Sequence, residues 1–187
     1  PSVDMDRIYI LGHSMGGLIA QMLGAKGLAE KLVLLTPAPP RGVVSYKGVP
    51  IGVYVKELIK WGWWRKPLRF GFEITEQTLF NCLPDKDRQS AHNRMVYESG
   101  RAALEIGFWL FDSNKASHVD ASTVSSPVLV VGAKQDKSTP PALVQKIAGY
   151  YRHVSTYREF ADHAHWIMNE PGWEKVAGYV CRWIEKE

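Results

Sequence analysis

Three residue types that together perform nucleophilic catalysis occur along the chain in the order Ser14, Asp136 and His165. A serine hydroxyl is a weak nucleophile, so it needs a base, and the base needs an acid that orients it. Each of the three side chains follows a run that is typical of a β-strand. Together, in this order and at three strand ends, they indicate nucleophilic catalysis more strongly than any one motif.

The serine lies in the motif Gly-x-Ser-x-Gly, between an apolar strand and a helix-forming run. A sharp turn there pushes one side chain out of the end of a sheet and holds it at strained backbone angles. We expect Gly12 and Gly16 to remove the Cβ atoms that would collide across the turn, and Gly17 to let the helix pack closely. Ser14 would then stand at a helix N-terminus, where free N–H groups favour negative charge. The alternative is a glycine-rich connection with a serine N-cap.

The acid and the base each have a rival. An acid can also follow the strand after the nucleophile helix, but no Asp or Glu occurs from residue 31 to residue 56, which favours Asp136 over that position. Asp136 could also be a solvated loop carboxylate.

His163 is the nearer rival of His165 for the role of base, and His-x-His could form half of a metal site. No cysteine or carboxylate cluster with ligand spacing accompanies it. His13 suits packing or hydrogen bonding better than the role of base.

The composition is that of an ordinary globular domain, with 187 residues, of which 45% are hydrophobic and 22% charged. A net charge of +4, scattered along the chain, does not indicate a nucleic-acid partner. The two cysteines, Cys82 and Cys181, lie in no motif and predict free thiols in a reducing, cytoplasmic setting. No apolar run approaches the roughly 20 residues of a membrane span.

The hydrophobic pattern predicts an α/β core interrupted by an insertion. Short apolar runs at 31–36 and 127–132 suit strands buried on both faces, and 153–160 reads as a further strand. We assign 1–40 and 121–187 to the core and 41–120 to a mainly helical cap. Within the cap, 42–50 reads as a loop, and 53–64, 75–80 and 90–111 read as helices. Pro171 is expected to open a final helix.

The chain resembles the C-terminal two-thirds of an α/β-hydrolase-fold serine hydrolase, esterase-like or lipase-like, with a helical cap. The motifs that carry the resemblance lie at both ends of the chain: Gly-His-Ser-Met-Gly-Gly at 12–17, Pro-Val-Leu-Val-Val-Gly-Ala-Lys-Gln-Asp at 127–136, and Ala-His-Trp at 164–166 before Glu170-Pro171. In this family the base stands immediately before a bulky residue and shortly before Glu-Pro, which favours His165 over His163.

The resemblance implies a Ser–His–Asp triad, an acyl-enzyme intermediate and no cofactor. The substrate would be a small apolar carboxylic ester. It also implies that the Met15 N–H is one donor of the oxyanion hole, and that a second donor comes from a loop after an earlier strand, for which this sequence offers no candidate. Acyl transfer, carbon–carbon bond hydrolysis, perhydrolysis and a non-catalytic interaction module remain open. Serine at position 14 disfavours the dehalogenases that use an aspartate nucleophile.

Three tryptophans and several basic residues make the cap distinctive: Trp61, Trp63, Trp64, Arg65, Lys66 and Arg69. Such interleaving can indicate nucleic acid or a membrane interface. The interpretation we favour at this stage is a cap whose aromatic side chains roof an apolar acyl pocket while the bases face water. The candidate substrate-binding residues are His13, Trp61, Trp64 and Trp109.

The sequence begins with Pro1, and only seven residues precede the nucleophile strand. Such a strand normally lies in the middle of a parallel sheet, so we expect the chain to be a fragment of a longer protein. Residues 8–11 would then form an exposed apolar sheet edge. We expect this edge to cause self-association and the chain alone to be nearly inactive.

Overall fold

The computed structural model describes residues 7–45, 47 and 51–186. Part of the loop expected over 42–50, namely 46 and 48–50, and most of the segment before the nucleophile strand lie outside the described residues. Among the described residues, no helix is long and apolar enough to cross a bilayer.

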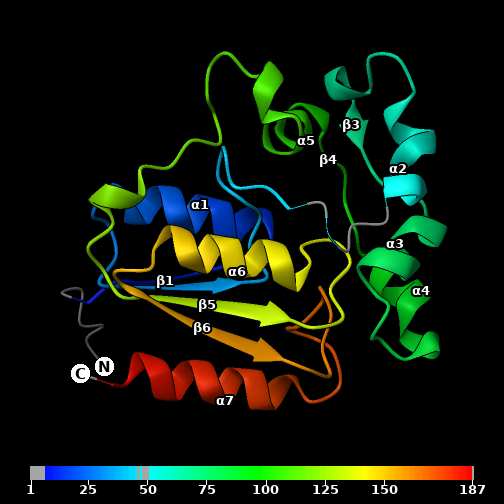
Figure 1. The fold of residues 1–187 in the computed structure, drawn as a ribbon. Helices are drawn as coiled ribbons and strands as arrows, with labels where there is room; N and C mark the ends of the chain where they lie inside the picture. The colour runs from blue at the N-terminus through cyan, green and yellow to red at the C-terminus, as the bar shows by residue number, and fades with distance from the viewer. Residues whose placement is uncertain (1–6, 46, 48–50, 187) are drawn as a thin grey trace.

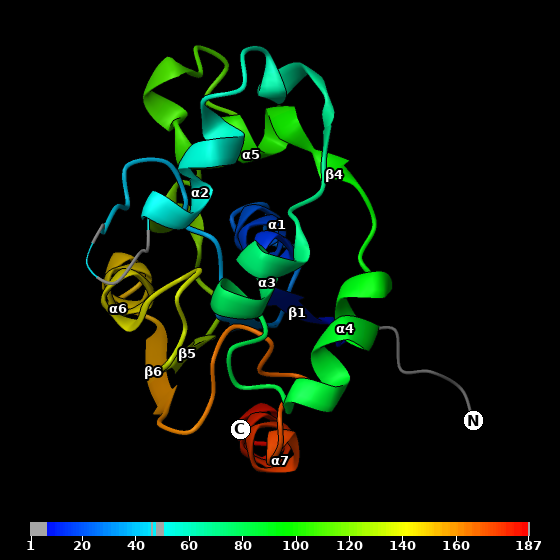
Figure 2. The same cartoon turned by 90° about the vertical axis from the view of Figure 1, so that its right-hand side faces the viewer.

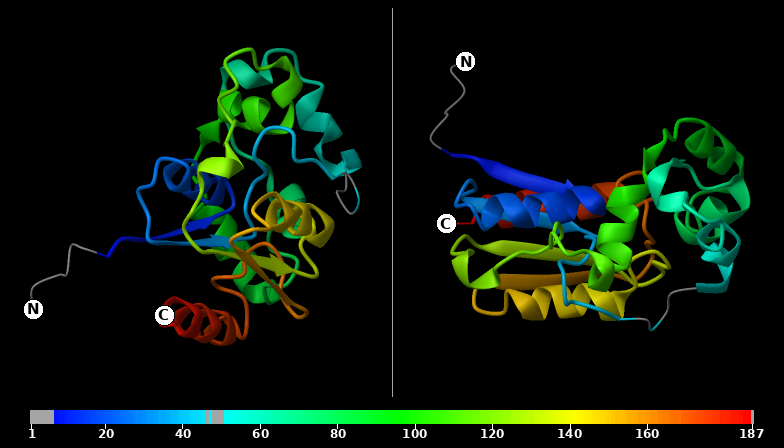
Figure 3. Two further views of the ribbon diagram at one scale, coloured as in Figure 1. Left: turned by 60° about the vertical axis from the view of Figure 1, so that its left-hand side comes forward. Right: turned by 90° about the horizontal axis from the view of Figure 1, so that it is seen from above.

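Four parallel strands form the central sheet, in the order β1 (Tyr9–His13), β2 (Lys31–Leu35), β5 (Val128–Ala133) and β6 (Ser155–Phe160). The three apolar runs and 153–160 are therefore strands, as predicted. All four strands run in one direction, so their carboxyl ends meet at one edge, on the right of Figure 1. Within the described chain β1 has a single neighbour, β2, and forms one side of the sheet, which Figure 3 shows from two further directions.

Helices cover both faces of the sheet (Figure 1). On one face, α1 (Met15–Gly24) and α6 (Pro141–Tyr150) bury Leu34 and its neighbours, and on the other face α7 (Trp173–Ile184) buries Val33 and its neighbours. Successive side chains of a strand point to opposite faces, so β2 after Lys31 and all of β5 lack polar side chains because both faces are covered.

The described elements between residues 51 and 111 form a separate group beyond the carboxyl ends of the strands (Figures 1 and 2). A two-stranded antiparallel sheet accompanies the helices, and the helix expected over 53–64 ends at Leu58. The elements are α2 (Ile51–Leu58), η1 (Trp63–Arg65), β3 (Pro67–Leu68), α3 (Phe72–Thr78), α4 (Asp85–Asn93), β4 (Glu98–Ser99), α5 (Gly100–Gly107) and η2 (Trp109–Phe111), followed by η3 (Ala121–Thr123).

The single helix predicted over 90–111 is wrong. The chain leaves α4 after Asn93 and pairs β4 with β3. Ser99 then caps α5, its Oγ accepting a hydrogen bond from the Ala102 N–H at 3.2 Å. A Cβ on Gly100 would lie 2.5 Å from the Trp63 carbonyl oxygen, so only glycine allows this close approach to η1. Within 90–111, the pair Ser99-Gly100 is the sequence signal that a new helix begins there.

A contact between two aromatic rings joins the cap to the core near the strand ends. The buried ring of Phe80 packs edge-to-face on Trp166, with 5.0 Å between centroids. Within the cap itself, the Arg41 guanidinium donates to the Asp112 carbonyl at 2.9 Å and lies over the Trp109 ring at 5.0 Å. The cap is thus anchored beside the loop that carries His165.

Candidate active site

The turn after β1 holds Ser14 in a strained conformation, with φ 50° and ψ −120°. Non-glycine residues rarely adopt such angles, and they persist where the surroundings enforce them. Here the Ser14 carbonyl accepts from the N–H groups of Gly17, Leu18 and Ala38, while its own N–H donates to Leu35. These bonds fix the backbone and leave the side chain directed out of the end of the sheet.

Two glycines make the turn possible, but not the pair that the motif suggested. A Cβ on Gly12 would lie 2.2 Å from the Gly16 carbonyl oxygen, and a Cβ on Gly17 would lie 2.7 Å from Pro37 Cβ. A Cβ on Gly16 would meet nothing within 4 Å. The expectation that Gly16 avoids a collision is therefore wrong, because its missing Cβ would point into open space.

The three side chains singled out in the sequence meet at the carboxyl ends of β1, β5 and β6. His165 Nε2 lies 3.0 Å from Ser14 Oγ, and His165 Nδ1 lies 2.8 Å from Asp136 Oδ2. An ionised carboxylate only accepts hydrogen bonds, so Nδ1 carries the proton and Nε2 is free to accept from the serine hydroxyl. Asp136 and His165 are 3% and 2% exposed, which keeps water from competing for their contact.

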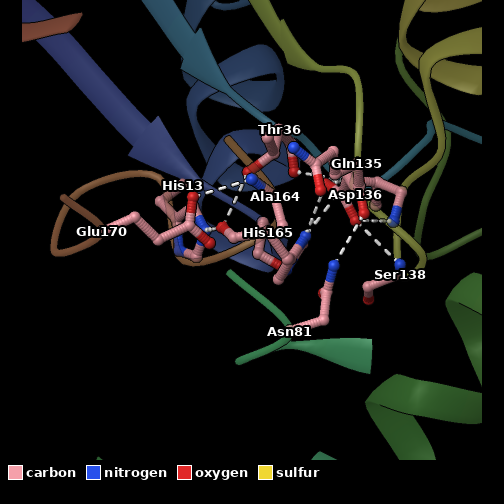
Figure 4. Close-up of polar contacts among 11 residues, drawn as sticks. His13, Thr36, Asn81, Gln135, Asp136, Ser138, Ala164, His165 and Glu170 are labelled. Carbon is pink, nitrogen blue, oxygen red and sulfur yellow. Dashed lines mark hydrogen bonds and ion pairs between the residues drawn. The ribbon is translucent and has the colours of Figure 1, made fainter. Parts of the chain in front are cut away.

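The Asp136 carboxylate is held by its own loop (Figure 4). Its Oδ1 accepts from the backbone N–H groups of Ser138 at 2.7 Å and Thr139 at 2.8 Å. Its Oδ2 lies 2.9 Å from Thr139 Oγ1 in addition to the histidine. These donors fix the orientation of the carboxyl group toward His165.

Sequence reasoning missed two threonines that support this pair. Thr36, at the end of β2, is buried with φ 40°, and its carbonyl oxygen lies 3.0 Å from Thr139 Oγ1. Its hydroxyl donates to the His165 carbonyl at 3.4 Å. Nothing in a lone threonine after an apolar run signals this role, because the contacts join three segments that are distant in sequence.

His13 packs against His165, the candidate base, and does not itself occupy the position of a base. Its Nε2 donates to the His165 carbonyl at 2.8 Å, and its ring lies 4.9 Å from the His165 ring. Burial, and then the neighbouring His165, lowers the pKa of His13 to about 4, so the ring is neutral near pH 7. The structure therefore gives His13 the packing and hydrogen-bonding position expected for it, next to the triad.

The rival histidine, His163, is buried away from Ser14. Its ring packs on Phe160 at 5.8 Å, and neither ring nitrogen has a hydrogen-bond partner among the described residues. Burial lowers its pKa. Within the same part of the chain, no group of three or more His, Cys, Asp or Glu side chains is arranged to hold a metal ion.

Glu170 supports the loop that carries His165. The carboxyl group is fully buried, and its Oε2 accepts from the Ala164 N–H at 2.7 Å (Figure 4). Its other oxygen has no hydrogen-bond partner among the described residues. Burial raises the pKa of Glu170 from 4.5 to about 7. Glu170, from the Glu-Pro pair noted in the sequence, thus contributes a buried carboxyl group that contacts Ala164, the residue directly before His165.

Met15, the expected oxyanion donor, is the first residue of α1. The N–H groups of a first helical turn have no partner within the helix. They lie at the positive end of the helix dipole, which favours anions. An oxyanion formed on a carbonyl attacked by Ser14 would lie beside this N–H.

The candidate tryptophans do not share one location. Trp61 is 89% exposed and contacts Trp64, with 5.3 Å between ring centroids. Trp109 lies under Arg41 at the base of the cap, and the buried member of the cluster is Trp63, which packs toward Phe108. The expectation that Trp61 roofs an acyl pocket is wrong for this structure, because its ring points into solvent.

Other cap side chains lie closer to the triad. Asn81 donates from Nδ2 to the carbonyl of Gln135 at 3.0 Å, directly before Asp136 (Figure 4). Burial raises the pKa of Tyr54, whose hydroxyl lies beside the hydroxyl groups of Thr78 and Ser138. The cap therefore reaches the acid loop through α2 and the segment after α3, neither of which the sequence indicated.

Comparisons with known proteins agree with the fold. Residues 2–177 match the model of the Alpha/beta hydrolase family. No curated protein sequence matches the chain significantly.

Solved structures share the fold at low sequence identity. A lipase candidate from Acinetobacter baumannii is 19% identical with a TM-score of 0.62, and the match covers 96% of this chain and 61% of that one. A monoacylglycerol lipase from Paleococcus ferrophilus is 21% identical with a TM-score of 0.61, covering 96% and 69%. An esterase from Exiguobacterium antarcticum is 17% identical with a TM-score of 0.63, covering 94% and 66%. The chain thus spans about 60 to 70% of the length of these proteins.

Proposed function

The chain belongs to the alpha/beta hydrolase family, and from this premise we propose that it carries the catalytic centre of a serine hydrolase that cleaves carboxylic esters. The observation that carries the proposal is the continuous hydrogen-bonded path from Ser14 Oγ through His165 to Asp136, with distances of 3.0 and 2.8 Å. The strained backbone at Ser14 adds support, since strain of this kind accumulates at functional sites. The family match supports the expectation that the chain is part of an enzyme.

In the proposed mechanism, Ser14 Oγ attacks the ester carbonyl while His165 Nε2 takes its proton. The oxyanion of the tetrahedral intermediate is stabilised by the Met15 N–H. His165 then gives the proton to the leaving alcohol, and an acyl-enzyme remains. Water, deprotonated by the same nitrogen, attacks the acyl carbonyl. His165 Nε2 then returns that proton to Ser14 Oγ as the bond between Oγ and the acyl carbon breaks and the carboxylic acid leaves. Asp136 holds the tautomer and stabilises the imidazolium throughout.

An apolar acyl or alcohol group fits the surroundings of the triad. The edge-to-face pair of Phe80 and Trp166 lies next to the His165 loop, and Trp166 also packs against His13 at 6.1 Å. A mostly apolar cleft of about 370 Å³ lies along the same tryptophan, lined in part by Met95 and Met168. We propose no cofactor, because each step uses only side chains and backbone groups of the chain.

Because the chain alone is expected to be nearly inactive, hydrolysis of p-nitrophenyl acetate and butyrate by the full-length protein and by its Ser14→Ala variant tests the proposal. We expect hydrolysis to fall to the buffer rate in the variant while its circular dichroism is unchanged, since the hydroxyl is all that is removed. A variant that hydrolyses these esters at a comparable rate would exclude Ser14 as the nucleophile. Acyl transfer, carbon–carbon hydrolysis and perhydrolysis would use the same triad, and product analysis with an added acceptor alcohol, diketone or peroxide separates them.

A further inference from the structure

The outer end of the cap carries large apolar side chains that the proposed chemistry does not use. Six of them are between 68% and 89% exposed in the described part of the chain. We call them the cap tip, and they are Ile59, Trp61, Val96, Tyr97, Leu110 and Phe111. They come from the turn after α2, the segment between α4 and β4, and η2.

Part of the cap tip borders a groove. Trp61 packs on Trp64 with 5.3 Å between centroids. Trp64 in turn lines an open groove of about 860 Å³ together with Tyr97 and Phe111. Every residue that lines this groove belongs to the cap, so the groove is not the site around Ser14. Scattered surface apolar residues are ordinary, but several large ones around one groove indicate an interaction site.

Two exposed cations without an ion-pair partner in the described chain, Arg65 and Lys66, lie beside the cap tip. The nearby Lys60 is paired with Glu57 at 2.6 Å, and Arg69 donates to the His92 carbonyl at 3.0 Å. Arg65 and Lys66 line the groove and are exposed.

The groove is lined by three cations and three acids, of which Glu105 and Asp112 have partners of their own. Glu105 pairs with Arg101 at 2.7 Å. Asp112 is buried and accepts from the backbone N–H groups of Asn114 and Ala116. Glu98 is the acid of the groove left exposed beside Arg65 and Lys66.

We propose that the cap tip and its basic neighbours Arg65 and Lys66 bind the surface of anionic phospholipid bilayers. Tryptophan and tyrosine favour the interface between headgroups and acyl chains, and phenylalanine and leucine insert below it. Lysine and arginine beside them are attracted to anionic headgroups. Short loops and 3₁₀ turns projecting from one end of a molecule suit shallow insertion. The proposal does not depend on the proposed hydrolase activity.

Co-sedimentation of the chain with vesicles tests the proposal directly. One set of vesicles is pure phosphatidylcholine, and the other contains 30% phosphatidylglycerol. We expect binding to the anionic vesicles to exceed binding to the neutral ones by about tenfold, and to weaken as salt is raised. Failure to sediment with either kind of vesicle would overturn the proposal.

Matched variants identify the surface. Trp61→Ser with Phe111→Ser should lower the partition coefficient on anionic vesicles by at least tenfold, because two inserting rings are lost. Ile19→Ser with Leu28→Ser removes two side chains that are about half exposed on the core, and should leave binding unchanged. Arg65→Glu with Lys66→Glu should abolish the preference for anionic vesicles, whereas Lys26→Glu with Lys134→Glu should change it little.

The same variants show whether the cap tip binds a lipid surface or a second copy of the chain. If the Trp61 and Phe111 pair changed only the sedimentation coefficient of the free chain and not vesicle binding, the cap tip would be a contact between copies, and the proposal would be wrong. An equal loss of binding in the core control would also contradict it. Circular dichroism melting of each variant ensures that folded chains are compared.

Discussion

At the scale of single residues, two histidines separated by one position have opposite surroundings. His165 bridges Ser14 and Asp136, whereas His163 is buried against Phe160 without a polar partner for its ring in the described chain. The alternation of side chains along a strand cannot tell which of the two histidines is the base. Both are buried, but they have different neighbours. The sequence favoured His165 through its resemblance to the family, and the contacts support the same choice.

The two histidines give the first prediction. His165→Ala should cost as much ester hydrolysis as Ser14→Ala, on the order of 10⁴- to 10⁶-fold in kcat, because triad members act as a unit. His163→Ala should cost less than about tenfold, since its ring touches no group of the triad. Steady-state kinetics on p-nitrophenyl acetate measures both. The reverse order of the two losses would move the base to His163.

Glu170 gives a prediction about pH. Its pKa is raised from 4.5 to about 7 by burial, so the folded state favours the protonated carboxyl. Ionisation is then easier in the unfolded chain, and the free energy of unfolding should fall as pH rises from about 4.5 to about 7. The decrease should be about 2–3 kcal/mol, from 1.36 kcal/mol per pKa unit.

Glu170→Gln removes this titration. Urea unfolding at pH 5 and pH 8 should therefore show a smaller decrease for Glu170→Gln than for the unmodified chain. The lowered pKa of His13 acts in both proteins and cancels in the comparison. Glu30→Gln, at an exposed position, is the control and should behave like the unmodified chain. Equal pH dependence in Glu170→Gln would show that the buried carboxyl does not titrate in this range.

At the scale of elements, the turn between β1 and α1 gives the third prediction. Gly12→Ala places a Cβ 2.2 Å from a backbone oxygen, so the turn must open. We expect the free energy of unfolding to fall by about 2–3 kcal/mol, the upper part of the range for overpacking. Gly16→Ala adds a methyl group in open space within a helix, and should be neutral or stabilising by up to about 1 kcal/mol.

Urea unfolding of both glycine variants checks the assignment. A large loss for Gly16→Ala with none for Gly12→Ala would mean that the turn has a different backbone from the one described. Near-equal small effects would show that the turn tolerates a Cβ at either position.

The elements differed in how well the sequence predicted them. Strands β2 and β5 are apolar at nearly every position, so composition alone identified them, and Gly-x-Ser-x-Gly identified the turn. The prediction for the cap was wrong at residues 94–99, where pairing of β4 with β3 outweighed the local tendency to form a helix. The exposure of Trp61 could not be predicted either, because periodicity does not tell an inward ring from an outward one. Thr36 and Thr139 act through tertiary contacts alone.

At the scale of the whole molecule, the free side of β1 is the main feature. Ile8 and Leu11 are 54% and 53% exposed, and Ile19 on the adjoining helix is 50% exposed. In the described part of the chain, the outer N–H and C=O groups of this strand have no neighbouring strand. An apolar strand with unpaired backbone groups is a template for pairing with another chain. The expected self-association therefore has a definite location in this structure.

Sedimentation velocity over a range of concentrations tests this expectation. The 187-residue chain should form dimers or larger species at micromolar concentrations, and Leu11→Lys should shift it toward monomer by placing a charge on the edge. Leu28→Lys, at a position 51% exposed outside the strand, should leave association unchanged. A monodisperse unmodified chain, or equal effects of the two lysines, would remove β1 as the associating surface.

The central claim is that Ser14 is a nucleophile activated by His165, and covalent labelling measures this without requiring turnover. The chain, Ser14→Ala and His165→Ala are each incubated with a fluorophosphonate, and the adduct is located by peptide mass spectrometry. The account predicts a single adduct on Ser14, none in Ser14→Ala, and a labelling rate constant lowered at least a hundredfold in His165→Ala. An adduct on another residue, or equal labelling of Ser14 with and without His165, would contradict it.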